Sequence, residues 1–250
     1  MNWFTPKCPV NDDDKEWLED CFLWLVEEFG ADVLRDVQMI LPTEEFFPEH
    51  FSAEKEDLQN LVNRVCAYMS VNPELIELNL FSDKNNLLRR DLPMFESSNS
   101  GAVGTYQKRR GKYIVSLETT QAANPTNLIA TIAHELGHAK LLGENRLDAD
   151  YEDHESLTDL TTVFFGMGIF TANSAFVFQQ WTDTFSQGWQ ATTHGYLSEE
   201  MFGYALALFA FLRGEDKPEW TNYLETNVRS YCKGSLKYLA KTENTKLKKL

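Results

Sequence analysis

The chain has 250 residues, of which 43% are hydrophobic and 24% are charged, so it can bury a core as one large or two small domains. This composition excludes a disordered tail protein and a collagen-like fibre. The 38 acidic residues outnumber the 23 basic ones and give a formal net charge of −15, which repels nucleic acid and anionic membrane surfaces, so neither is an expected partner.

The N-terminal stretch, residues 1–7, lacks a basic segment followed by an apolar one. No secretory signal is readable, and we therefore expect a cytoplasmic protein. The four cysteines form no CxxC pair, which argues against a disulfide framework and against thiolate zinc ligands. The longest apolar stretches fall short of the ~20 residues that a membrane-spanning helix needs.

Two helices are predicted in the first third of the chain. The first spans residues 13–29, with Asp13 or Asp14 as its N-cap, and carries an apolar stripe at helical spacing. The second begins at Ser52 and ends before Pro73. A loop with two prolines separates them.

Three short strands follow the second helix. Residues 74–81 alternate between apolar and polar side chains, a pattern typical of a half-buried strand. Residues 102–107 and 112–117 flank a turn in which Gly111 is expected to have a positive φ, and together they predict a hairpin. We expect the three strands to form a small mixed sheet.

The rest of the chain is predicted to be mostly helical. Asn124 and Pro125 precede a helical pattern at residues 126–142, which Gly143 closes. Further helical patterns occupy residues 150–170, 175–185, 198–212 and 219–231. The predicted fold class is therefore α+β, rich in helix and with one small sheet.

The helix at residues 126–142 contains the sequence His134-Glu135-Leu136-Gly137-His138, which matches the pattern HExxH. Residues i and i+4 lie on one face of a helix, so both imidazoles can point at one metal ion. Glu135 is then angled to reach a water molecule bound to that metal. The alternative is a pair of exposed histidines beside a glutamate.

Two histidines do not complete a catalytic zinc site, which typically has three protein ligands. Glu155 and Asp159 lie one turn apart in the next predicted helix. Glu155 can supply the third ligand, and Asp159 can hold a ligating imidazole by its far nitrogen. Glu144, His154 and Asp159 remain alternatives for the third ligand, because ligand type alone does not decide between them.

HELGH on a helix after a hairpin, with ExxxD on the following helix, resembles the gluzincin group of zinc metallopeptidases. The resemblance covers about residues 112–160. It implies a zincin-like domain with an active-site helix, and a zinc ion held by His134, His138 and Glu155. It also implies that Glu135 is the general base and that Asp159 is the partner of a zinc histidine.

His194 and Tyr196 precede the helix predicted from Ser198. Peptidases of this type often use a downstream His or Tyr to hydrogen-bond the oxyanion that develops at the scissile carbonyl. Both residues are therefore candidates for that role. The alternative is that they are loop residues that pack near the start of the helix.

The predicted organisation has three parts. An N-terminal helical segment spans residues 1–52, and a metallopeptidase domain with a C-terminal helical subdomain spans residues 53–232. A basic tail spans residues 233–250, where six lysines face one glutamate, so residues 1–232 carry −20. The tail is either an interaction arm or a helix end that frays into solvent.

The sequence thus predicts a cytoplasmic, zinc-dependent peptidase that hydrolyses a peptide or protein substrate. A different class of function is a catalytically silent protein-interaction module that zinc stabilises. Structural zinc sites are normally closed by four protein ligands, often thiolates, so the glutamate of the HExxH pattern favours the enzyme. Nothing in the sequence indicates the substrate, the cleavage specificity or the oligomeric state.

Overall fold

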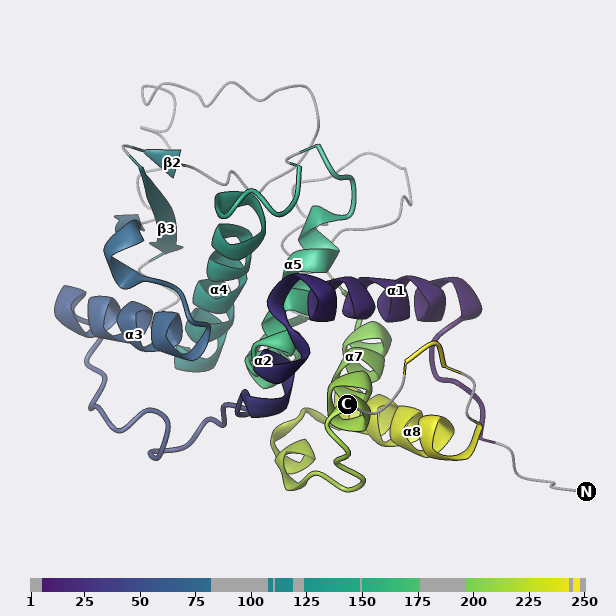
Figure 1. Cartoon of the computed structure of the whole chain (residues 1–250). Helices are drawn as coiled ribbons and strands as arrows, with labels where there is room; N and C mark the ends of the chain where they lie inside the picture. The colour runs from purple at the N-terminus through teal and green to yellow at the C-terminus, as the bar shows by residue number, and fades with distance from the viewer. Residues whose placement is uncertain are drawn as a thin grey trace, which may run out of the picture.

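The computed structural model describes residues 6–81, 108–109, 111–118, 124–148, 150–175, 197–242 and 245–247. Most of these residues are helical, and a small sheet lies at one side of the molecule (Figure 1). The predicted helix-rich α+β fold is therefore confirmed. The α-helices are α1 (Asp12–Phe29), α2 (Ala31–Asp36), α3 (Lys55–Tyr68), α4 (Pro125–His138), α5 (His154–Phe164), α7 (Glu199–Leu212) and α8 (Thr226–Thr242).

Helices α4 and α5 lie side by side near the middle of the molecule (Figure 1). Helix α3 contacts α4, whereas α1 and α7 contact α5, and α8 packs along α7. The segment predicted at residues 1–52 shares this core, because Leu18, Phe22 and Leu25 of α1 are fully buried. Burying such side chains is the main force that holds α4 and α5 in place.

The sheet consists of β1 (Ile76–Phe81), β2 (Lys108–Arg109) and β3 (Lys112–Glu118), in the order β1-β3-β2. Strands β1 and β3 are parallel, and the short β2 pairs antiparallel with the start of β3. Residues 108–109 were expected in the hairpin turn but pair as a strand, and the predicted strand at residues 102–107 lies outside the described part of the chain. Strand β3 contacts α4 and so supports the helix that carries HExxH.

Helix α1 begins earlier than the sequence predicts, since its N-cap lies two or three residues before the predicted one. Its N-cap is Asn11, whose side-chain Oδ1 accepts a hydrogen bond from the backbone N–H of Asp14 at 2.8 Å. Asp13 and Asp14, the predicted caps, lie inside the first turn instead. Their carboxylates still stabilise the helix there, because the helix dipole is positive at this end.

The single helix predicted at residues 150–170 is divided in two. Helix α5 ends at Phe164, and a new helical stretch starts at residue 168. Gly166 between them has a φ of +77°, and a Cβ atom there would lie 2.0 Å from the backbone oxygen of Gln38. The helix is therefore interrupted where Gly166 packs closely against a segment that is distant in the sequence. Helical periodicity alone does not reveal such a contact.

The C-terminal region also differs from the prediction. Helix α8 continues to Thr242, so the boundary predicted at residue 233 falls inside a helix. Apolar packing explains this continuation, since Tyr238 and Leu239 are buried. Further on, the Nζ atom of Lys246 lies 2.8 Å from Glu16 and 2.7 Å from Asp20, both on α1.

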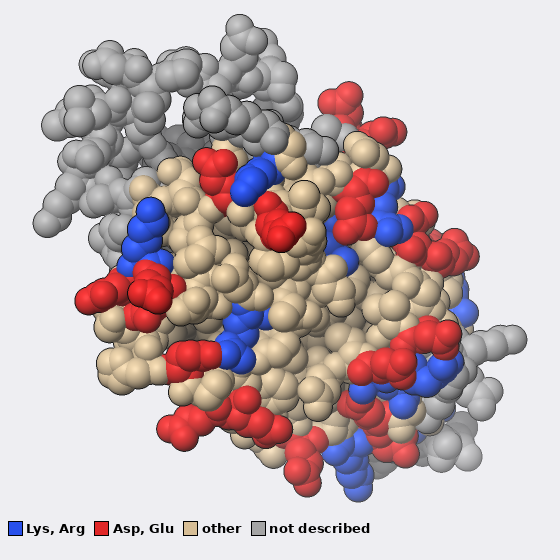
Figure 2. All heavy atoms as spheres, turned by 60° about the vertical axis from the view of Figure 1, so that its left-hand side comes forward, with Lys and Arg blue, Asp and Glu red and all other residues tan. Residues whose placement is uncertain are grey.

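One face of the molecule carries charged side chains of both signs. Figure 2 shows them in separate groups, in which acidic and basic side chains lie together, with uncharged residues between the groups. Among the described helices, none combines the length and the apolar composition that crossing a membrane requires.

Candidate metal centre

His134 and His138 lie one helical turn apart on α4, on the side that faces α5. Both side chains are buried, and their ring centroids are 4.7 Å apart. Helix α4 starts at Pro125, after the N-cap Asn124, whose side chain accepts a hydrogen bond from the backbone N–H of Asn127. The start of α4 is thereby defined by local sequence, and the i, i+4 spacing then places the two imidazoles together.

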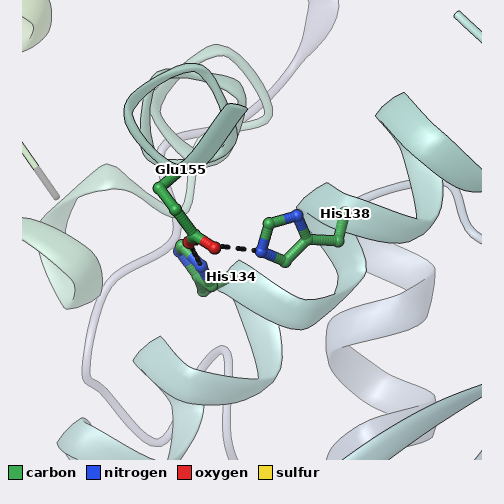
Figure 3. Close-up of side chains that lie close together, drawn as sticks. All are labelled: His134, His138 and Glu155. Atoms are coloured by element: carbon green, nitrogen blue, oxygen red, sulfur yellow. Dashed lines mark hydrogen bonds and ion pairs between the residues drawn. The ribbon is translucent and has the colours of Figure 1, made fainter. Parts of the chain in front are cut away.

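Glu155, in the first turn of α5, reaches across to both imidazoles. Its Oε2 atom lies 3.0 Å from the Nε2 atom of His134 and 3.4 Å from the Nε2 atom of His138. Figure 3 shows the carboxylate of Glu155 directed at a nitrogen atom of each ring. The three ligand atoms lie within 4.8 Å of one another, so this group can hold a metal ion.

The far nitrogen of His134 contacts Asp159. Its Nδ1 atom lies 2.8 Å from the Oδ1 atom of Asp159, and the other oxygen of that carboxylate accepts a hydrogen bond from the backbone N–H of Leu197 at 3.0 Å. The contact between Nδ1 and Asp159 orients the ring so that its Nε2 atom faces Glu155. Asp159 therefore lies where the sequence analysis expected the outer partner of a metal-binding histidine.

The far nitrogen of His138 contacts Thr158, a residue that the sequence analysis did not single out. The Nδ1 atom of His138 lies 3.1 Å from the Oγ1 atom of Thr158. A signal was present, because residues 155, 158 and 159 share one face of a helix by their i, i+3 and i+4 spacing. Glu155, Thr158 and Asp159 thus form one row on α5 that faces the row of histidines on α4.

The alternatives for the third ligand lie in other positions. Glu144 is exposed and pairs with Arg146 at 2.8 Å, outside the cluster. Asp159 contacts the Nδ1 atom of His134, on the far side of the ring from Glu155. His154 lies closer than expected, since its Nδ1 atom is 3.5 Å from the Oε1 atom of Glu155. Of the candidates, Glu155 is the one whose oxygen faces both Nε2 atoms.

Opposite charges lie close together in this site. Burial alone would lower the pKa of His134, but the hydrogen bonds and charges of Asp159 and Glu155 raise it well above its ordinary value. Burial would raise the pKa of Glu155, but hydrogen bonds from His134 and His138 hold it well below its ordinary value. The two carboxylates therefore stabilise positive charge at this point of the fold.

Glu135 follows His134 on α4 and is half-buried. Burial raises the pKa of its carboxyl group, and the charges of His138 and His134 oppose that rise. Glu135 is therefore close enough to both imidazoles for their charges to act on its carboxyl group. That position suits a group that exchanges a proton beside the histidines.

The chain leaves α4 through a π-helical turn, Ala139–Gly143, rather than through a continued α-helix. Such turns are rare and are found frequently at functional sites. The hydroxyl of Tyr113 on β3 donates a hydrogen bond to the backbone oxygen of Gly143 at 2.7 Å. The end of the HExxH helix is therefore held by the sheet, and the wider turn redirects the chain toward α5.

Helices α4 and α5 approach each other closely at Gly137, inside the HExxH pattern. A Cβ atom at this residue would lie 2.8 Å from the Cγ2 atom of Thr158 and 3.2 Å from its backbone oxygen. Only glycine leaves room for this approach. Gly137 therefore sets the distance at which the carboxylate of Glu155 meets the histidines.

Gly137→Ala should weaken metal binding even though it changes no ligand. Alanine favours a helix by about 1 kcal/mol over glycine, but overpacking against α5 costs about 1–3 kcal/mol, so we expect a net loss of stability. Because α5 must move away from α4, the carboxylate of Glu155 should no longer contact both imidazoles. Chemical denaturation and a metal titration measure the two effects, and a variant with unaltered metal affinity would contradict this role of Gly137.

His194 and Tyr196, the candidate oxyanion donors, lie outside the described residues. The described chain resumes at Leu197, whose backbone N–H donates to Asp159 as given above. Their part in the site stays a prediction from the sequence.

No family model matches the chain, and neither the curated proteins nor the solved structures contain a match to it. The residues of the site and their geometry are therefore the grounds for a function.

Proposed function

We propose that the protein is a zinc-dependent peptidase of the gluzincin type, with His134, His138 and Glu155 as its metal ligands. The observation that carries this proposal is the convergence of two Nε2 atoms on one oxygen of Glu155, at 3.0 and 3.4 Å. Two imidazoles and one carboxylate make up a ligand set that catalytic zinc uses in peptidases, with a further position for water or substrate.

The donor set fits a divalent cation in two further respects. Each imidazole is held by its Nδ1 atom, so that its Nε2 atom can bind a metal. The Oε1 atom of Glu155 is buried and has no hydrogen-bond partner among the described residues. A buried carboxylate oxygen without a hydrogen bond is costly unless a positive charge compensates it.

A zinc ion held by His134, His138 and Glu155 would supply a Lewis acid, which would polarise the scissile carbonyl and lower the pKa of water to about 7. Glu135 takes a proton from the attacking water as the water oxygen bonds to the carbonyl carbon. It then delivers that proton to the amide nitrogen, and the carbon–nitrogen bond breaks. Asp159 keeps the ring of His134 in orientation throughout the reaction.

The surrounding fold supports a zincin-like arrangement. The HExxH helix α4 lies between the sheet and the helix α5 that brings the carboxylates. The substrate in this proposal is a peptide, and the excess of acidic residues favours a positively charged one. We retain a cytoplasmic location as part of the proposal.

Metal analysis and cleavage of casein by the full-length protein test this function together. We expect about one zinc ion per chain, cleavage of casein, loss of cleavage after chelation, and its return when zinc is added back. Zinc without cleavage over a wide pH range would contradict the peptidase and favour the interaction module. A protein that binds no divalent metal would contradict both.

A further inference from the structure

We propose that Thr158 is a positioning residue for His138, and that its hydroxyl selects the ring nitrogen of His138 that binds the metal. The inference rests on the proposed metal site and concerns a residue that the HExxH and ExxxD patterns do not include. Four observations carry it: the contact with His138, the direction of a second hydrogen bond, the burial of Thr158 and its packing against Gly137.

The direction of the hydrogen bonds follows from the chemistry of a hydroxyl group. Threonine has a single O–H to donate. In the structure that hydroxyl donates to the backbone oxygen of His154, one turn earlier in α5, at 2.7 Å. The Oγ1 atom of Thr158 is then left to accept from the Nδ1–H of His138 at 3.1 Å. When the Nε2 atom binds a metal, the ring therefore keeps its proton on Nδ1, the nitrogen that faces Thr158.

Packing holds the side chain of Thr158 in this orientation. The residue is 0% exposed. Its methyl carbon Cγ2 faces Gly137, so closely that a Cβ atom on that glycine would lie 2.8 Å away. Rotation about the Cα–Cβ bond would move the methyl group out of this contact and the hydroxyl away from His138. One side chain therefore sets both the spacing of the two helices and the tautomer of a ligand.

The two histidines are supported unequally as a result. His134 donates to the carboxylate of Asp159, which carries a charge, whereas His138 donates to a neutral hydroxyl. A carboxylate partner raises the basicity of an imidazole ligand more than a hydroxyl does. We infer that Thr158 contributes to the metal site through orientation and proton placement, with little change in the charge of the site.

Two substitutions separate this role from simple packing. Thr158→Val keeps the size and the methyl group but removes the hydroxyl, whereas Thr158→Ser keeps the hydroxyl but removes the methyl group. We expect Thr158→Val to lose about 10–100-fold in zinc affinity, the range typical for outer partners of ligating histidines. Thr158→Ser should stay closer to the wild type. If Thr158 acts by packing alone, the order of the two variants reverses.

The first measurement is zinc competition against a chromophoric chelator. The second is ¹⁵N NMR of the imidazoles in the full-length protein saturated with zinc. Circular dichroism checks that each variant folds. NMR should show the Nδ1–H tautomer of His138 in the wild type and in Thr158→Ser, and a mixture of tautomers in Thr158→Val. An unchanged tautomer in Thr158→Val, or an unchanged zinc affinity, would overturn the proposal.

A failure of the role proposed for Thr158 can be distinguished from a failure of the proposed function. A wild-type protein that binds zinc but cleaves nothing leaves the role of Thr158 intact and removes the peptidase. A peptidase whose Thr158→Val variant binds zinc as tightly as the wild type leaves the function intact and removes the role of Thr158. Neither zinc affinity nor the NMR spectrum depends on cleavage, so they decide the role of Thr158 in either case.

Discussion

Glu135→Gln should reduce peptide cleavage by about 10²–10⁴-fold, the usual contribution of a general base, while the protein keeps its full content of zinc. The amide has nearly the same shape as the carboxylate, but it cannot take a proton from water. Glu135 is not among the three residues whose ligand atoms converge, so its replacement should leave the metal site assembled. Initial rates of casein cleavage and the zinc content of the same preparation give both results.

His134→Ala is the matched comparison for this variant. It removes one of the three ligand atoms, together with the imidazole that Asp159 and Glu155 contact. We therefore expect it to lose both zinc and cleavage. Cleavage by Glu135→Gln at the wild-type rate would contradict the assignment of Glu135 as general base, and full zinc content in His134→Ala would contradict the ligand set.

The residues that the structure brings together were predictable where their relation is local. His134 and His138 share a helix face through their i, i+4 spacing, and so do Glu155 and Asp159. When two such pairs lie on consecutive helices, few packings of the two helices bring all four side chains together. This explains why the structure brings Glu155 and Asp159 to the predicted histidines.

The contacts across the two helices were harder to predict. The bond between Thr158 and His138 depends on how α5 is rotated against α4, and the position of His154 beside Glu155 depends on where α5 begins. The first of these depends on the close approach of α5 to Gly137. A sequence pattern records which residues share a face but not the distance between two faces.

The ends of the helices were also hard to predict from the sequence, because they too depend on contacts between distant segments. The break at Gly166 results from contact with the backbone of Gln38, and the extension of α8 results from the burial of Tyr238 and Leu239. The π-helical turn after His138 is tied to Tyr113 of the sheet. In each case a tertiary contact overrides local propensity.

Glu155→Gln should reduce zinc affinity by more than about 100-fold, because the loss of a direct ligand exceeds the 10–100-fold cost of losing an outer partner. The amide oxygen can still reach the two imidazoles, but it carries no negative charge to offset a divalent cation. Cleavage should fall with zinc occupancy and recover in part at high zinc concentration. A chelator competition series, with rates measured at each zinc concentration, tests both expectations.

Glu144→Gln is the control, because Glu144 is a carboxylate that the sequence also allowed as third ligand and that lies outside the cluster. It is exposed and pairs with Arg146 at 2.8 Å, so its replacement removes a surface ion pair of about 0–1 kcal/mol. Zinc affinity should then stay at the wild-type value. If Glu144→Gln loses zinc and Glu155→Gln keeps it, the chain after α4 must fold back toward the histidines when metal binds. The row of Glu155, Thr158 and Asp159 on α5 would then support the site only through its hydrogen bonds to the rings.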